Sequence, residues 1–125
     1  MTSTATFTIE MHPGQSLIDG SARFDFTKTW NGALEGTSHG AMLTAGDPAT
    51  GSAGYVALEI FDGTLEGRGG TIALQQLGTM DAGEPQLQFV LAPGSGTGEL
   101  AGVTGTLTIE SVGDDGVHQV GVALH

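Results

Sequence analysis

The sequence contains no cysteine among its 125 residues. A disulfide framework and a metal site built on thiolates are therefore excluded. Basic side chains are almost as scarce, because three Lys and Arg stand against 14 Asp and Glu and the net charge is −11. Nucleic acids and anionic membrane surfaces are bound through clustered cations, so we expect neither as a partner.

Long apolar segments are missing as well. No run reaches the roughly 18 to 20 residues of a membrane-spanning helix. The first residues, MTSTATFTIEM, lack the basic and apolar regions of a secretory signal peptide. These absences predict a cytoplasmic protein, and the length fits a single domain over residues 1–125.

Helical periodicity is absent too, and strand patterns take its place. Short runs in which Thr, Val, Phe and Ile alternate with other residues are separated by turn-forming segments, of which Asn31-Gly32 and Asp62-Gly63 are the strongest. The predicted strands lie at residues 2–10, 23–30, 34–44, 54–61, 65–80, 86–91, 103–112 and 117–124. Strands at hairpin spacing form either a sandwich or a barrel. We favour closure, which removes exposed edges, and predict a closed antiparallel eight-stranded β-barrel with little or no helix.

Two short motifs point to enzyme classes, but their neighbours argue against both. Residues 36–40, Gly-Thr-Ser-His-Gly, match the nucleophile elbow of hydrolases, yet too few residues follow for the helix that this elbow needs. Residues 96–101, Gly-Thr-Gly-Glu-Leu-Ala, match part of a dinucleotide fingerprint, yet a strand pattern follows. A hydrolase built on Ser38 and His39 stays a third possibility. The four histidines lack metal-ligand spacing, so we predict no metal and no cofactor.

Two glutamates, Glu35 and Glu59, lie inside predicted strands rather than in turns. Glu59 shares one strand face with Tyr55. The opposite face of that strand is purely apolar and consists of Val56, Leu58 and Ile60. The alternation rule favours the apolar face inside. In the other orientation the glutamate and tyrosine line the lumen, where burial raises a carboxyl pKa toward neutrality and favours proton transfer. Gln76 presents the same choice of faces.

Six segments together resemble one bacterial protein family. They are residues 34–38, 40–45, 51–59, 63–68, 74–81 and 93–102. The family is a domain of unknown function, DUF3224, and the similarity covers nearly the whole chain. This family looks like part of the allene oxide cyclase-like barrel superfamily. The resemblance implies a closed eight-stranded barrel that is often oligomeric.

Members of that wider group guide the cyclisation or coupling of hydrophobic small molecules without a cofactor. The resemblance therefore implies a lined lumen in which Glu59, Glu35 and Tyr55 are the catalytic candidates. The candidate ligand-binding residues are Gln76, Trp30 and Phe61.

Two hypotheses follow. The first is a barrel that binds a hydrophobic small molecule, extending to a cofactor-independent isomerase or cyclase. The alternative is a non-enzymatic binding or assembly protein whose barrel is filled by its own side chains. Its outer face would then pack against another subunit, through Phe24, Phe26 or the apolar face of residues 56–60. In either case we expect a homo-oligomer, such as a dimer.

Overall fold

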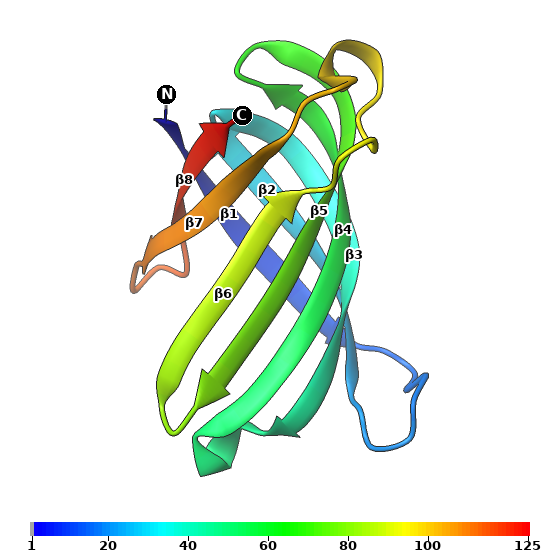
Figure 1. The fold of residues 1–125 in the computed structure, drawn as a ribbon, viewed down its shortest axis with the longest axis vertical. Coiled ribbons are helices and arrows are strands. Elements are labelled where there is room, and N and C mark those ends of the chain that lie inside the picture. Colours follow the sequence, from blue (N-terminus) through cyan, green and yellow to red (C-terminus); the bar gives the residue numbers. More distant parts are fainter. Residues whose placement is uncertain (1) are drawn as a thin grey trace.

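The computed structural model describes residues 2–125 as a closed barrel in which each strand pairs antiparallel with the next and β8 pairs with β1 (Figure 1). The strands are β1 (Thr2–Pro13), β2 (Arg23–Gly32), β3 (Leu34–Asp47), β4 (Ser52–Leu65), β5 (Arg68–Asp81), β6 (Glu84–Leu91), β7 (Gly105–Val112) and β8 (His118–Leu124). Two short 3-10 helices, η1 (Pro48–Thr50) and η2 (Gly98–Leu100), lie in connections. The predicted fold class is confirmed. Within residues 2–125, no helix is long and apolar enough to cross a membrane.

One of the two predicted hairpin turns is correct and the other is wrong. Asn31-Gly32 lies where β2 turns into β3, and Gly32 has a φ of 98°. Asp62-Gly63 instead lies inside β4, which continues to Leu65. The chain turns at Glu66-Gly67, where φ is positive at both residues, as a two-residue hairpin of the primed type requires.

Gly63 is needed for strand packing rather than for a turn, because β3 and β4 come unusually close at this position. It faces Gly36 of β3 across the sheet. A Cβ atom on Gly63 would lie 2.2 Å from the carbonyl oxygen of Glu35 and 2.9 Å from Cα of Gly36. A side chain at this position would therefore push β3 and β4 apart.

One end of the barrel is filled with apolar side chains. The buried cluster there includes Trp30, Leu34, Phe61 and Leu65 from the ends of β2, β3 and β4. Leu100 of η2 is fully buried in the same cluster. The connection between β6 and β7 thus packs against this end, near which β1 begins and β8 ends (Figure 1).

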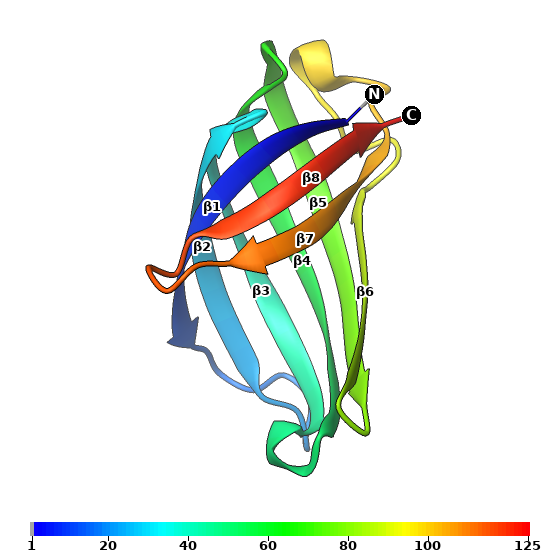
Figure 2. The same ribbon diagram turned by 90° about the vertical axis from the view of Figure 1, so that its left-hand side faces the viewer.

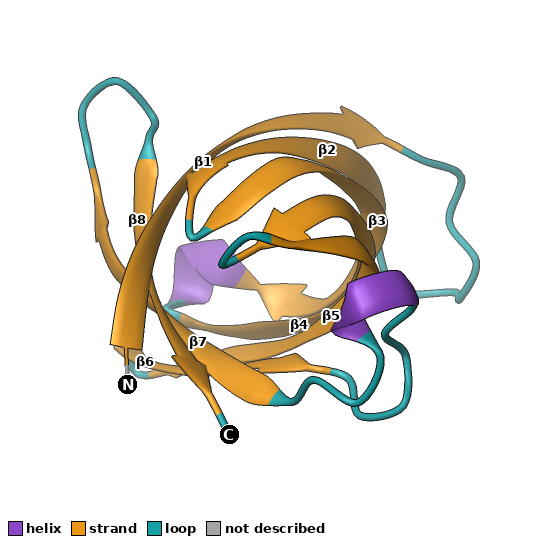
Figure 3. Cartoon of the chain, turned by 90° about the horizontal axis from the view of Figure 1, so that it is seen from above, coloured by secondary structure: helices purple, strands orange, loops and turns teal. Residues whose placement is uncertain are grey.

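The other end extends beyond the short strands β7 and β8. Strand β6 pairs with β7 at only two positions, Val90 with Thr106 and Leu91 with Gly105. Below these pairs β6 and β7 diverge, as Figure 2 shows from the side. Figure 3 looks along the barrel and shows the strands closing into a ring. The barrel therefore has one weakly joined seam, which runs along the lower part of β6.

Candidate functional site

The lower half of the barrel in Figure 1, opposite the end that is filled with apolar side chains, contains a cavity of about 860 Å³. Its wall is mostly apolar and includes Phe24, Met42, Tyr55, Met80, Leu87 and Ile109. Leu87 and Ile109 come from β6 and β7, the two strands on either side of the weak seam. The alternative expectation of a barrel filled by its own side chains therefore holds at one end only. Phe24 and Phe26 are not on the outer face, because Phe24 lines this cavity and Phe26 is buried.

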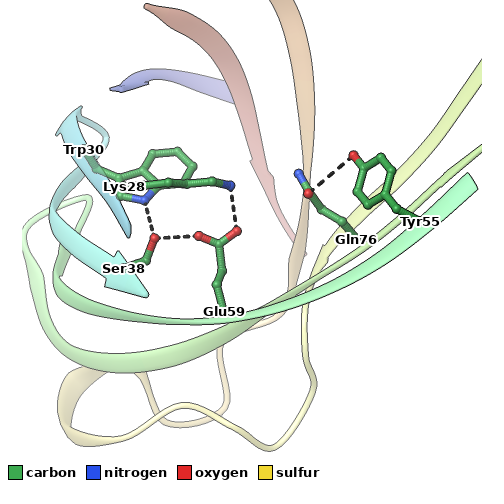
Figure 4. Close-up of polar contacts among 6 residues, drawn as sticks. All are labelled: Lys28, Trp30, Ser38, Tyr55, Glu59 and Gln76. Carbon is green, nitrogen blue, oxygen red and sulfur yellow. Dashed lines mark hydrogen bonds and ion pairs between the residues drawn. The ribbon is translucent and has the colours of Figure 1, made fainter. Parts of the chain in front are cut away.

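The phenol ring of Tyr55 is held in the cavity wall by a glycine. Tyr55 of β4 faces Gly78 of β5, and a Cβ atom at Gly78 would lie 2.3 Å from Cε1 of the ring. The ring therefore lies directly over the glycine, in the space that a side chain would fill. The Tyr55 hydroxyl lies 3.5 Å from Oε1 of Gln76, which points into the barrel from β5 (Figure 4).

Beyond this layer, toward the filled end, lies a buried polar chain of four residues (Figure 4). Nζ of Lys28 donates to Oε1 of Glu59 at 2.7 Å. Oγ of Ser38 donates to the other carboxylate oxygen, Oε2, at 2.5 Å. Nε1 of Trp30 donates to Oγ of Ser38 at 3.0 Å. Both oxygens of Glu59 are thus engaged, as a buried carboxylate requires.

The ammonium group of Lys28 is surrounded by aromatic rings. The distances from Nζ to the ring centroids are 4.3 Å for Phe7, 5.1 Å for Phe89, 5.3 Å for Phe26 and 5.5 Å for Trp30. Rings within about 6 Å attract a cation through their electron-rich faces. Glu59 and the four rings together therefore stabilise a charge that lies 3% exposed in the barrel interior.

Strand geometry explains why these side chains meet. Lys28 of β2 faces Ser38 of β3, and Gly40 of β3 faces Glu59 of β4. A Cβ atom at Gly40 would lie 2.7 Å from Cβ of Glu59, so the glycine leaves the glutamate the room that it needs. Side chains two residues apart share a face, and Lys28 and Trp30 therefore both point inward.

The site residues Lys28 and Tyr55 have shifted pKa values. Burial lowers the pKa of the Lys28 ammonium below its usual 10.5, although the nearby Glu59 carboxylate acts in the opposite direction. Burial raises the pKa of the Tyr55 phenol above 10.0, and the negative charge of Glu59 raises it further. Tyr55 therefore stays protonated, and can donate a hydrogen bond, throughout the neutral range.

The structure brings most of the predicted residues inside. Tyr55 lines the cavity, and Gln76 contacts Tyr55. Trp30, Glu59 and Phe61 are also inside the barrel, but they are almost fully buried and do not line the cavity. The face of β4 that holds Tyr55 and Glu59 thus points inward, against the alternation rule.

Glu35 is the exception, and its expected position in the lumen is wrong. Leu34 and Ser38, which lie on the inward face of β3, are buried. Glu35 lies on the opposite face of the strand and is exposed. The strand phase therefore places the Glu35 carboxylate on the outer surface.

Two residues of the polar chain were not among the residues predicted to line the lumen. Lys28 lies on the same strand face as two phenylalanines and a tryptophan, and a lysine in such a stripe indicates a buried partner. Ser38 lies in the hydrolase-like motif, but His39 is exposed on the outer face while Ser38 is buried. Successive side chains of a strand point to opposite faces, so the two do not form a nucleophile and base pair. Within residues 2–125, no group of three or more His, Asp and Glu side chains could hold a metal ion.

The chain is similar to a protein family and to a solved structure. A family model described as "Protein of unknown function (DUF3224)" matches residues 3–123. A crystal structure of a protein with unknown function from the same family, from Shewanella oneidensis MR-1, is 35% identical, and the match covers 100% of this chain and 96% of that one. The TM-score is 0.88, so the two barrels share one fold. None of the curated proteins matches the chain.

Proposed function

The chain belongs to the DUF3224 family, and we propose that its barrel binds a hydrophobic small molecule in the open half of the lumen. The cavity of about 860 Å³ carries this proposal, since ligand pockets of small molecules span about 300 to 1,000 Å³ and are mostly apolar. Burial of apolar ligand surface would provide the binding free energy, at about 25 cal/mol per Å². The fixed Tyr55 ring would orient the ligand.

We further propose that the family is related to the allene oxide cyclase-like barrels, and such a relation would extend the proposal to catalysis. A closed eight-stranded barrel with an apolar cavity and an interior glutamate supports it. In a cofactor-independent isomerisation or cyclisation, Tyr55 would donate a hydrogen bond to an oxygen of the reacting molecule, because it lines the cavity. Glu59 would keep Tyr55 in its protonated form through its charge, since its own carboxylate is bound to Lys28 and Ser38.

A titration with N-phenyl-1-naphthylamine, a neutral dye that fluoresces in apolar surroundings, tests the binding proposal. We expect saturable binding at one site per chain. The variant Met80→Trp adds an indole to the cavity wall and should weaken binding at least about tenfold. The matched control is Thr37→Trp, because Thr37 is exposed on the outer face of β3 and lines neither the cavity nor the outer groove. A dye that fails to bind, or that binds both variants equally, would contradict the proposal.

A second role, as a self-assembling subunit, is favoured by the outer face of β4 and β5. Val56 is 49%, Leu58 52% and Leu77 46% exposed. A groove of about 500 Å³ that these residues line includes no charged side chain, although the chain carries a net charge of −11. Apolar patches free of charge are typical of the buried centre of an interface.

We propose that a second copy of the chain covers this face in an isologous dimer. Sedimentation velocity should then show a dimer for the wild type and a monomer for Leu58→Glu, with Thr37→Glu on the outer face of β3 as the control. A monomeric wild type would contradict the assembly role and leave ligand binding intact.

A further inference from the structure

The cavity wall lacks a positive charge that could bind an anionic ligand. Among the described residues that line it, the one charged side chain is Asp47. The chain has three Lys and Arg in all. Lys28 is bound to Glu59 and Arg23 to Asp25, each at less than 3 Å. Neither arginine nor lysine lines the cavity, so a carboxylate or sulfonate placed there would lose its hydration without gaining a counter-charge.

The third cation lies far from the cavity along the barrel. Arg68 is the first residue of β5, next to the β4–β5 turn at the filled end. The cavity is lined from the opposite end, by residues around the β3–β4 and β5–β6 turns. The overall charge of −11 adds a further barrier against anions.

A cationic ligand finds no buried counter-charge either. Both carboxylate oxygens of Glu59 are engaged, by Lys28 and by Ser38. Asp47 lies at the rim, where it is exposed and accepts a hydrogen bond from the backbone nitrogen of Ala49 at 3.0 Å. The interior of the cavity therefore suits uncharged groups.

The Tyr55 hydroxyl is the polar group best placed to orient such a ligand. Its contact with Oε1 of Gln76 is 3.5 Å, well beyond the usual 2.7 to 2.8 Å of a hydrogen bond between two oxygens. The phenol proton is thus only weakly engaged. The Tyr55 ring packs directly against Gly78, so the hydroxyl group is held in place before a ligand binds.

We propose that the cavity selects an uncharged hydrophobic ligand whose hydrogen-bond acceptor, a carbonyl or ether oxygen, takes the proton of the Tyr55 hydroxyl. The inference rests on the proposed binding function and deepens it by naming the ligand class. The two parts, neutrality and the acceptor, are tested separately.

Neutrality is tested with two dyes that differ by one charged group. N-phenyl-1-naphthylamine is neutral, and 1-anilinonaphthalene-8-sulfonate is the same molecule with a sulfonate. Buried charges without a partner are strongly disfavoured, so we expect the neutral dye to bind at least about tenfold tighter. The comparison is repeated at high salt, where a preference due only to the overall negative charge would disappear. Equal binding of the two dyes at high salt would overturn the inference.

The acceptor is tested with 6-propionyl-2-dimethylaminonaphthalene, a neutral dye with one ketone. Loss of one hydrogen bond should weaken its binding to Tyr55→Phe roughly fivefold, and its emission should shift to the blue. N-phenyl-1-naphthylamine, which has no carbonyl, serves as the control and should bind both proteins equally. A second variant, Gly78→Ala, keeps the phenol but displaces the ring, and should weaken the ketone dye selectively as well.

The outcomes separate the inference from the function on which it rests. If none of the three dyes binds, the proposed function itself fails. If the dyes bind but the sulfonated dye binds as tightly as the neutral one at high salt, the cavity does not select neutral ligands. If Tyr55→Phe binds both neutral dyes as the wild type does, Tyr55 is not the group that holds the acceptor.

Discussion

At the scale of single residues, the ion pair of Lys28 and Glu59 separates the filled half of the barrel from the hollow half. Removing charges from water costs free energy that a single ion pair does not always recover. Here Ser38 and the aromatic rings provide additional contacts to the two charges. We therefore expect the pair to fix the arrangement of the interior more than it adds to the free energy of unfolding.

The ion pair can be tested by a double-mutant cycle. Lys28→Met should lower the free energy of unfolding by about 3 to 5 kcal/mol, because it leaves the Glu59 carboxylate buried without its partner. Glu59→Gln should also destabilise, since it leaves the ammonium group without a counter-charge. The double variant should be more stable than the sum of the two effects predicts, as measured by urea unfolding. Additive effects would show that the two charges do not interact.

His118 makes the stability depend on pH in a defined direction. Its ring stacks on Phe7, with centroids 4.4 Å apart and an angle of 11°. Burial lowers the pKa of His118 below 6.5, a hydrogen bond from its Nδ1 to the carbonyl oxygen of Gly116 acts in the opposite direction, and the charge of Lys28 lowers it further. The folded state thus binds the proton less readily than the unfolded chain does. Its contribution to stability is present above pH 6.5 and is lost as the pH falls through the folded pKa.

The variant His118→Phe isolates this effect, because phenylalanine keeps the stacked ring and cannot bind a proton. Between about pH 7.5 and about pH 5, the wild type should lose more stability than the variant does. Thermal unfolding of both proteins at each pH measures the difference. Parallel curves for the two proteins would show that His118 does not contribute.

At the scale of strands, the sequence predicted the number and approximate positions of all eight elements, because alternation and turn residues are local signals. The face of β4 was not predictable in the same way. Val56, Leu58 and Ile60 are the more apolar set, yet they lie outside, and Glu59 lies inside. The inward position of Glu59 depends on Lys28 and Ser38, which come from other strands. A pattern within one strand does not contain that information.

Two glycines near the end of β4 have different structural roles. Gly63 allows the close approach of β3 and β4, and Gly67 forms the turn into β5. Gly63→Ala should cost about 3 kcal/mol, because its Cβ atom would overlap the backbone of β3. Gly67→Ala should cost only about 1 kcal/mol, because the residue has a φ of 83° but no atom within 4 Å of the new Cβ. Urea unfolding of the two variants compares these costs. A cost at Gly67 equal to or larger than that at Gly63 would show that β3 and β4 do not come unusually close at Gly63.

The seam between β6 and β7 should be visible in hydrogen exchange. Only Val90 and Leu91 of β6 pair with β7. Every second amide from Gln86 to Phe89 therefore faces the seam without a strand partner. We expect these amides to exchange faster than those of β4, which is paired on both sides. Uniform protection along β6 would show that the seam is closed in solution.

At the scale of the whole molecule, the barrel combines a packed end and an open end. Strands β3, β4 and β5 have 14 residues each, while β7 has 8 and β8 has 7. This difference in length leaves the cavity at the lower end. The closed barrel could be predicted from hairpin spacing. The cavity could not, because it depends on which side chains fill the lumen and on where pairing between β6 and β7 stops.

The most direct test of the central claim is a crystal structure of the protein with bound 1-bromonaphthalene, a neutral molecule whose bromine gives an anomalous signal. We predict one bromine peak inside the barrel, between Tyr55, Met42 and Met80. An empty lumen, with bromine only in the outer groove beside Leu58, would contradict the claim that the open half of the barrel is a ligand site.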